Sequence, residues 1–160
     1  MAAGGTYDVI ATTTLGSTAS SYTFSSIPGT YTDLVIVFSG NGSPTDFFSI
    51  RFNGDTTTAY SVVDFYGTGA SAASFRANNV TKMSRLPVVN NSIAKINVMN
   101  YANTTTFKTV LSRGDSTSDS THTVAGLWRS GSAITSVTLV HDAGSFSVGS
   151  TFTLYGITAA

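Results

Sequence analysis

The sequence contains no Glu, no Gln and no Cys, and it has only 1 Trp and 3 Pro among its 160 residues. Without Glu the chain lacks one of the two carboxylates used in acid and base catalysis, and without Cys it has no thiol nucleophile, disulfide or thiolate metal site. No apolar stretch approaches 18 residues, the length at which a membrane-spanning helix is expected. These absences disfavour an enzyme, a metal or cofactor site, and a membrane partner.

Charge is also scarce. The 8 basic and 8 acidic residues give a formal net charge of zero, which leaves little electrostatic protection against self-association. Such a surface suits a protein that works as part of an assembly. The nearest group of cations, Arg76, Lys82 and Arg85, is too sparse for a nucleic-acid groove, so we expect no nucleic-acid partner.

The chain is rich in residues that favour strands. It has 26 Thr and 23 Ser, and Val, Ile, Phe and Tyr fill most of its apolar positions, whereas the strong helix formers Glu and Gln are missing. We therefore predict an all-β fold, namely an antiparallel β-sandwich, jelly-roll-like, of about ten strands. A closed barrel is the second choice. A length of 160 residues indicates one domain over residues 7–160, preceded by a flexible N-terminal arm at residues 1–6.

Short apolar or alternating runs between Gly-, Asn-, Ser- and Pro-rich turns mark the strands. The pair Asn53-Gly54 tolerates positive φ and predicts a tight hairpin between residues 47–52 and 56–66. Residues 67–74 are small and polar, which indicates an exposed loop or a poorly formed edge. The last two strands, 134–140 and 151–157, are expected to pair with each other. The other strands are expected at 7–15, 21–25, 34–38, 82–88, 93–100, 107–111 and 121–127.

The two histidines are the first candidates for chemistry. His141 is followed by Asp142, but neighbouring residues of a strand point to opposite faces, and the chain has no Gly-x-Ser-x-Gly elbow. We expect His141 to end a strand and Asp142 to begin an Asx turn. A small hydrolase that uses His122, His141 and the Asp residues is the least favoured function.

Two further motifs have an ordinary interpretation. Asp115 and Asp119 offer oxygen ligands for a hard cation, and Arg113-Gly114-Asp115 spells an integrin-binding tripeptide. A solvated hairpin loop explains both. Trp128 can act as a stacking platform, but an indole at a strand end is more often packed on the core.

Five segments of the chain form a recognisable set. They are FSSIP at 24–28, YTDL at 31–34, RFNGD at 51–55, LWRS at 127–130 and GSTFTLYGI at 149–157. In the same order along the chain and over residues 7–157, they resemble a family of small virion structural proteins of tailed bacteriophages, and the final segment is the most distinctive. The resemblance implies a β-rich particle component rather than an enzyme, in which Asn53 and Gly54 form a turn and Trp128 and Phe152 are core or interface anchors.

The resemblance and the composition lead to one preferred function. We expect a capsid decoration (cement) protein on the outer capsid surface of a virion assembled in the host cytoplasm. Its partner would be the major capsid protein, whose subunits it would bridge, and it would form a homotrimer. No cofactor is expected.

The alternative is a tail-fibre or surface adhesion module that binds host glycans or receptors. Tyr66, Trp128 or Tyr155 would then supply stacking faces, with Asn and Thr side chains as hydrogen-bond partners. Copy number separates the two, because a tail component is present in few copies per particle and a cement protein in hundreds.

Overall fold

The computed structural model describes residues 6–44, 46–115 and 120–158. Every regular element in these ranges is a strand, so the predicted all-β fold is confirmed. None of the described segments is a helix of the length and apolarity needed to cross a membrane. The strands are β1 (Tyr7–Thr14), β2 (Ser21–Phe24), β3 (Asp33–Gly40), β4 (Gly42–Ser43), β5 (Asp46–Phe52), β6 (Tyr60–Thr68), β7 (Ser71–Val80), β8 (Met83–Val88), β9 (Ser92–Val98), β10 (Lys108–Asp115), β11 (Ser120–Trp128), β12 (Val137–His141), β13 (Ser145–Phe146) and β14 (Thr151–Ile157).

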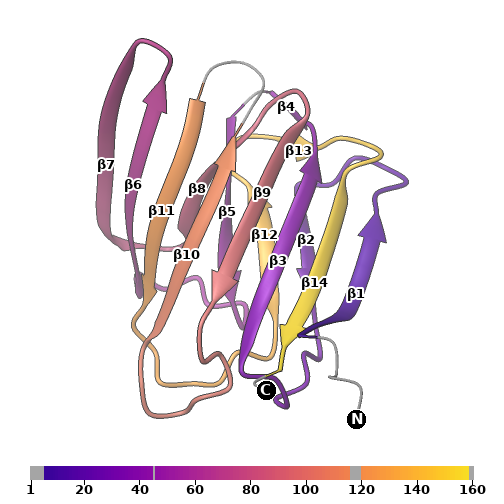
Figure 1. The fold of residues 1–160 in the computed structure, drawn as a ribbon, viewed down its shortest axis with the longest axis vertical. Helices are drawn as coiled ribbons and strands as arrows, with labels where there is room; N and C mark the ends of the chain where they lie inside the picture. Colours follow the sequence, from indigo (N-terminus) through magenta and orange to yellow (C-terminus); the bar gives the residue numbers. More distant parts are fainter. Residues whose placement is uncertain (1–5, 45, 116–119, 159–160) are drawn as a thin grey trace.

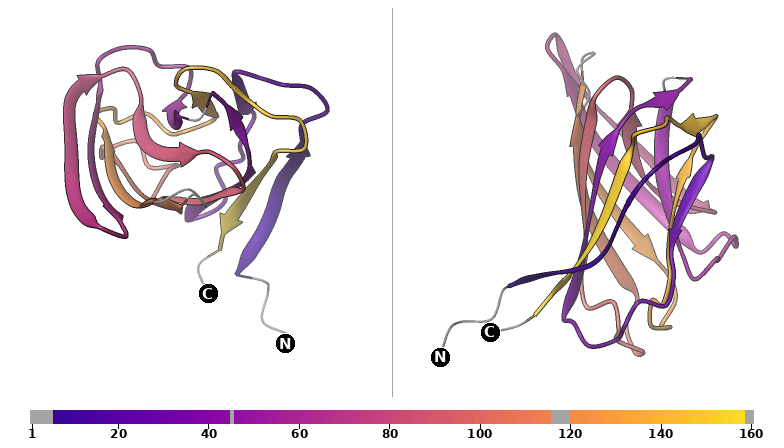
Figure 2. Two further views of the ribbon diagram at one scale, coloured as in Figure 1. Left: turned by 90° about the horizontal axis from the view of Figure 1, so that it is seen from above. Right: turned by 90° about the vertical axis from the view of Figure 1, so that its right-hand side faces the viewer.

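The strands form two main antiparallel sheets that pack face to face (Figures 1 and 2). The large sheet has eight strands in the order β1-β14-β3-β9-β10-β11-β6-β7, and the small sheet has four in the order β2-β12-β5-β8. The short strands β4 and β13 pair separately. This is the antiparallel β-sandwich expected from the sequence. Both main sheets are open, with free edge strands, so the closed barrel is not the fold.

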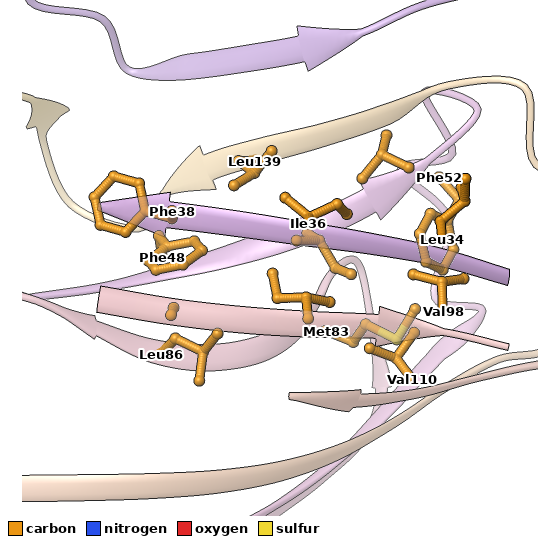
Figure 3. Close-up of a cluster of buried hydrophobic side chains, with 14 of the residues drawn as sticks. Leu34, Ile36, Phe38, Phe48, Phe52, Met83, Leu86, Val98, Val110 and Leu139 are labelled. Carbon is orange, nitrogen blue, oxygen red and sulfur yellow. The ribbon is translucent and has the colours of Figure 1, made fainter. Parts of the chain in front are cut away.

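The core lies between the two main sheets. Along β3, Leu34, Ile36 and Phe38 point inward and are fully buried, because successive side chains of a strand alternate between its faces. They meet Phe48 and Leu139 of the small sheet (Figure 3). Burying one such side chain stabilises the fold by roughly 1.5–3 kcal/mol. This apolar layer fixes which face of each strand looks outward.

The large sheet is wider than the small one. Its strand β7 lies at the sheet edge beyond β6 (Figure 1), and most of its residues are exposed on both faces. Of the two structures predicted for residues 67–74, an exposed loop or a poorly formed edge, the edge is therefore the correct one. In the structure these residues end β6, turn, and begin β7.

The predicted hairpin at Asn53-Gly54 is wrong, although the turn exists. Both residues have positive φ, and the N–H of Asp55 donates to the carbonyl of Phe52 at 2.8 Å. However, β5 pairs with β12 and β8, whereas the following strand β6 belongs to the large sheet. The buried side chain of Tyr60 packs in the core, so the chain crosses from one sheet to the other instead of folding back.

The predicted closing pair is also wrong. The strand β12 pairs with β2 and β5 in the small sheet, whereas β14 pairs with β1 and β3 in the large sheet. Phe146 lies between these two strands in the sequence and is fully buried, so the segment that joins β12 to β14 packs in the core as it passes from one sheet to the other. The predicted N-terminal arm lies outside the described residues except for Thr6.

Candidate functional site

Large apolar side chains remain exposed on the solvent face of the large sheet. Besides Tyr7 and Val9 of β1, four of them lie on β6, β9 and β10, and we call this part of the sheet the outer sheet face. The four are Val63 (37% exposed), Phe65 (59%), Ile93 (53%) and Leu111 (51%). Strand alternation explains their exposure, because their neighbours along each strand fill the core. They come from β6, β9 and β10, which with β11 make up the middle and one side of the sheet.

The strand register groups these side chains. Leu111 is opposite Ala125 on β11, and Ala125 is opposite Val63 on β6. Two residues away on each strand, on the same face, Thr123 of β11 is opposite Phe65 of β6. Only small side chains therefore separate Val63, Phe65 and Leu111, which form one apolar surface. Ile93 lies beyond the charged pair Lys95 and Arg113, opposite Asp115.

A shallow groove of about 360 Å³ lies on the same sheet, across β3, β9, β10 and β11. Its wall includes Val37 and Ile93 and the charged residues Lys95, Arg113 and Asp115. Lys95 Nζ donates to the hydroxyl of Tyr7 at 3.3 Å and lies 5.4 Å from the centre of that ring. An apolar patch rimmed by charges of both signs is the composition of a protein-binding surface.

A second cluster, which we call the Asp64 network, lies at the β8 side of the sandwich. Asp64 is fully buried on β6, and His122 on the neighbouring β11 is 2% exposed. The His122 Nδ1–H donates to Asp64 at 2.9 Å, and its Nε2 lies 3.1 Å from Ser120 Oγ. Arg85 of β8 donates to the same carboxylate at 3.2 Å. The network joins the large sheet to the edge of the small one.

Aromatic rings enclose this network. The guanidinium of Arg85 lies 3.5 Å from the ring centre of Phe47 and 5.1 Å from that of Phe75. His122 stacks on Tyr66 at 5.2 Å and contacts Phe47 edge-on at 5.6 Å. Rings that exclude water strengthen the electrostatic attraction between the buried carboxylate and its two partners.

The contacts from Ser120 through His122 to Asp64 follow the order of a hydrolytic triad, so their chemistry needs a test. Two features argue for a structural role. Asp64 accepts hydrogen bonds from Arg85 as well as from His122, so its carboxylate does not serve the histidine alone. Ser120 lies on a regular strand and not on the strained turn that exposes a nucleophile. We interpret the network as a structural contact that holds β6 and β11 of the large sheet against β8 of the small sheet.

The other histidine is a structural residue. His141 ends β12 as predicted, but the Asx turn is wrong, because the His141 ring accepts the N–H of Gly144 at 2.9 Å through Nδ1. Its Nε2 is buried with no hydrogen-bond partner among the described residues. Burial lowers the pKa of His141, more than the nearby Asp46 and Asp142 raise it, which favours the neutral ring. Asp142 points away and pairs with Lys82 at 2.6 Å.

The residues selected from the sequence fall into two groups: Trp128 lies beside the turn of Asn53 and Gly54, and Phe152 and Tyr155 lie on β14. Trp128 (3% exposed) and Phe152 (0%) are core residues, which removes the interface alternative for both. Trp128 Nε1 donates to Asp55 at 2.7 Å. Tyr155 is half-buried on the solvent side of β14 and contacts Tyr7 edge-on.

Asn53 binds the neighbouring connection to β12. Its Oδ1 accepts the N–H groups of Thr135 and Ser136 at 2.8 and 3.1 Å, and its Nδ2 donates to the carbonyl of Ala133. With Gly54 it forms a turn that holds two segments together. Neither residue is part of a chemical site.

The solvated hairpin loop expected around Arg113-Gly114-Asp115 is described only in part. Arg113, Gly114 and Asp115 are the last three residues of β10, and Asp119 is outside the described residues. Among the described residues no three His, Asp or Glu side chains are placed to hold a metal ion.

Sequence reasoning missed the outer sheet face and the Asp64 network for different reasons. The alternation of Val63 and Phe65 with buried residues is visible in the sequence, but it does not say which set faces the core. Asp64 and His122 are 58 residues apart, and only the pairing of β6 with β11 brings them together.

No family model matches this chain, and no curated protein does. Similar solved structures include a galectin from Caenorhabditis elegans, at 10% identity over 92% of this chain and 96% of that chain, with a TM-score of 0.39. Galectin 2 from chicken is 13% identical over 83% and 97%, with a TM-score of 0.39. An exo-inulinase from Aspergillus awamori is 14% identical over 94% of this chain and 29% of that chain, with a TM-score of 0.47. These likenesses concern β-sandwich architecture, and we transfer no residue role from them.

Proposed function

We propose that this protein is a bacteriophage virion structural protein that decorates the outer capsid surface, where it bridges and stabilises major capsid subunits. The observation that carries the proposal is the outer sheet face, a wide surface on which Val63, Phe65, Ile93 and Leu111 stay exposed. The resemblance of the sequence to small phage virion proteins supplies the kind of partner.

The chemistry of this face suits contact with another protein. Grouped apolar side chains with a polar rim are typical of interaction sites, and a handful of large residues usually supply most of the binding energy. Thr and Ser side chains between them add hydrogen bonds and exclude water. A formal net charge of zero presents no long-range repulsion to a closely packed shell.

We also propose that the protein is not an enzyme. The support is the Asp64 network, in which the carboxylate is shared by His122 and Arg85 and the serine lies on a regular strand. Such a network rigidifies the sandwich, which is useful in a particle component.

The adhesion alternative has less support. Trp128, its largest stacking face, is buried, and Tyr66 stacks on His122. Tyr155 keeps a half-buried ring against Tyr7. Of the three proposed platforms, none presents a free, fully exposed ring.

The test is binding of the purified chain to capsid shells that lack it, measured by co-sedimentation. Leu111→Asp, in the outer sheet face, should weaken binding about tenfold or more, as expected for loss of a central apolar contact. Val148→Asp is the matched control, because Val148 is also largely exposed (59%, against 51% for Leu111) but lies in the loop after β13. Equal effects of the two substitutions, or no binding by the unaltered chain, would contradict the proposal.

A further inference from the structure

The two main sheets have four edge strands, β1 and β7 in the large sheet and β2 and β8 in the small one. An edge strand presents unpaired main-chain N–H and C=O groups, which are a template for pairing with another strand. Proteins protect such edges with short strands, bulges, prolines or charged side chains. The four edges of this molecule differ in that protection.

Three edges are protected. The strand β2 has only 4 residues. In β1 the register shifts between Val9 and Ala11, so Ile10 forms a bulge in the edge. In β8 the register is interrupted near Ser84, which has a positive φ, and Pro87 removes a main-chain donor.

The remaining edge, β7, has none of these devices over most of its length. It is 10 residues long, and its register with β6 is uninterrupted from Ser71, opposite Thr68, to Asn78, opposite Ser61. It contains no Pro, Lys or acidic residue, and Arg76 is its one charge. A bulge occurs only beyond this stretch, at Asn79. The strand is therefore open to pairing.

We propose that β7 pairs with β7 of a second copy of this chain, antiparallel about a two-fold axis, so that two large sheets become one. The sequence of the strand fits itself. With the axis at Phe75, each Phe75 lies opposite its symmetry mate, Ala73 lies opposite Ala77, and Ser74 lies opposite Arg76. No like charges meet, and the small side chains allow close approach.

The faces of the strand agree with this register. Arg76 and Ser74 are opposite Val63 and Phe65 of β6, which places both on the solvent side of the sheet. Phe75 is opposite Asp64 and therefore on the other side, where it reaches Arg85. Each proposed pair thus joins residues of the same face, as an antiparallel ladder requires.

A second copy satisfies the edge better than a foreign strand, because one two-fold contact closes the open edges of both molecules at once. It also covers Phe75, which is 40% exposed in the single chain. This inference is independent of the proposed capsid function. It predicts a pair in place of the homotrimer expected from the sequence, which would need a different contact.

The experiment is sedimentation equilibrium of the full chain at micromolar concentrations, where we expect twice the chain mass of 16.6 kDa. Ser74→Lys places a cation opposite Arg76 of the partner at two symmetric positions, and it should weaken the pair about fivefold or more. Ser74→Asp should tighten it by a similar factor. Ser74 is exposed, so neither substitution disturbs the core.

Thr14→Lys is the matched control, since it adds the same charge to an exposed position of the opposite edge strand, β1. It should leave the dissociation constant unchanged. A monomer at all concentrations or three times the chain mass would overturn the inference. So would a pair that both Ser74 variants weaken, or that Thr14→Lys weakens as much as Ser74→Lys does.

Discussion

Removing the guanidinium of Arg85 should destabilise the fold through the carboxylate that it leaves behind. Asp64 is fully buried and has two charged or polar partners, His122 and Arg85. In Arg85→Met the aliphatic stem remains, but one partner of the carboxylate and the cation–π contact with Phe47 are lost. Breaking a buried ion pair costs about 3–5 kcal/mol.

Because Arg85 keeps 30% of its side chain exposed, solvent already screens part of this pair. We therefore expect a loss of about 2–3 kcal/mol in the free energy of unfolding, or a fall in Tm of roughly 4–12 °C for a domain of this size. Urea unfolding followed by tryptophan fluorescence measures it. Arg113→Met is the control, since Arg113 is exposed and has no ion-pair partner among the described residues. A cost below about 0.5 kcal/mol for Arg85→Met, the range of ordinary surface substitutions, would refute the role assigned to the network.

Three further outcomes follow from the structure. Burial holds the pKa of His141 in the folded protein below its value in the unfolded chain, so below about pH 6.5 the unfolded chain binds the proton first and the free energy of unfolding should fall. Urea unfolding at pH 7 and pH 5 should show a smaller fall for His141→Gln than for the unaltered chain. Trp128→Phe should cost about 1–3 kcal/mol by thermal unfolding, because the buried end of Trp128 would no longer donate to Asp55, and a cost near zero would argue against that bond. Ser120→Ala should hydrolyse p-nitrophenyl acetate at the same rate as the unaltered chain, and a fall with Ser120→Ala would reveal catalysis by the Asp64 network.

Local sequence signals predicted the strands well where the side chains alternate or form apolar runs. The last strand, β14, begins and ends where the sequence predicted, and the run at residues 34–38 forms most of β3. The strand β7 gave a weak signal, because most of its residues are small or polar and exposed, and its pairing with β6 is its main contact with the rest of the molecule.

Pairing between strands could not be read in the same way. Asn53-Gly54 makes the predicted turn, but burial of Tyr60 and Phe52 in the core decides that the chain then crosses between sheets. Trp128 could have been a surface platform, and only its position beside Phe52 and the acceptor on Asp55 place it in the core. Such choices depend on contacts between distant segments, for which a single sequence carries no local signal.

The copy number of this chain in purified virions tests the proposed decoration role most directly. Quantitative mass spectrometry against the major capsid protein gives the ratio of the two chains. Decoration of the shell predicts about one copy for each major capsid subunit, or hundreds per particle. Only a few copies per particle would favour the tail-fibre or adhesion alternative, and absence from virions would contradict a virion role of either kind.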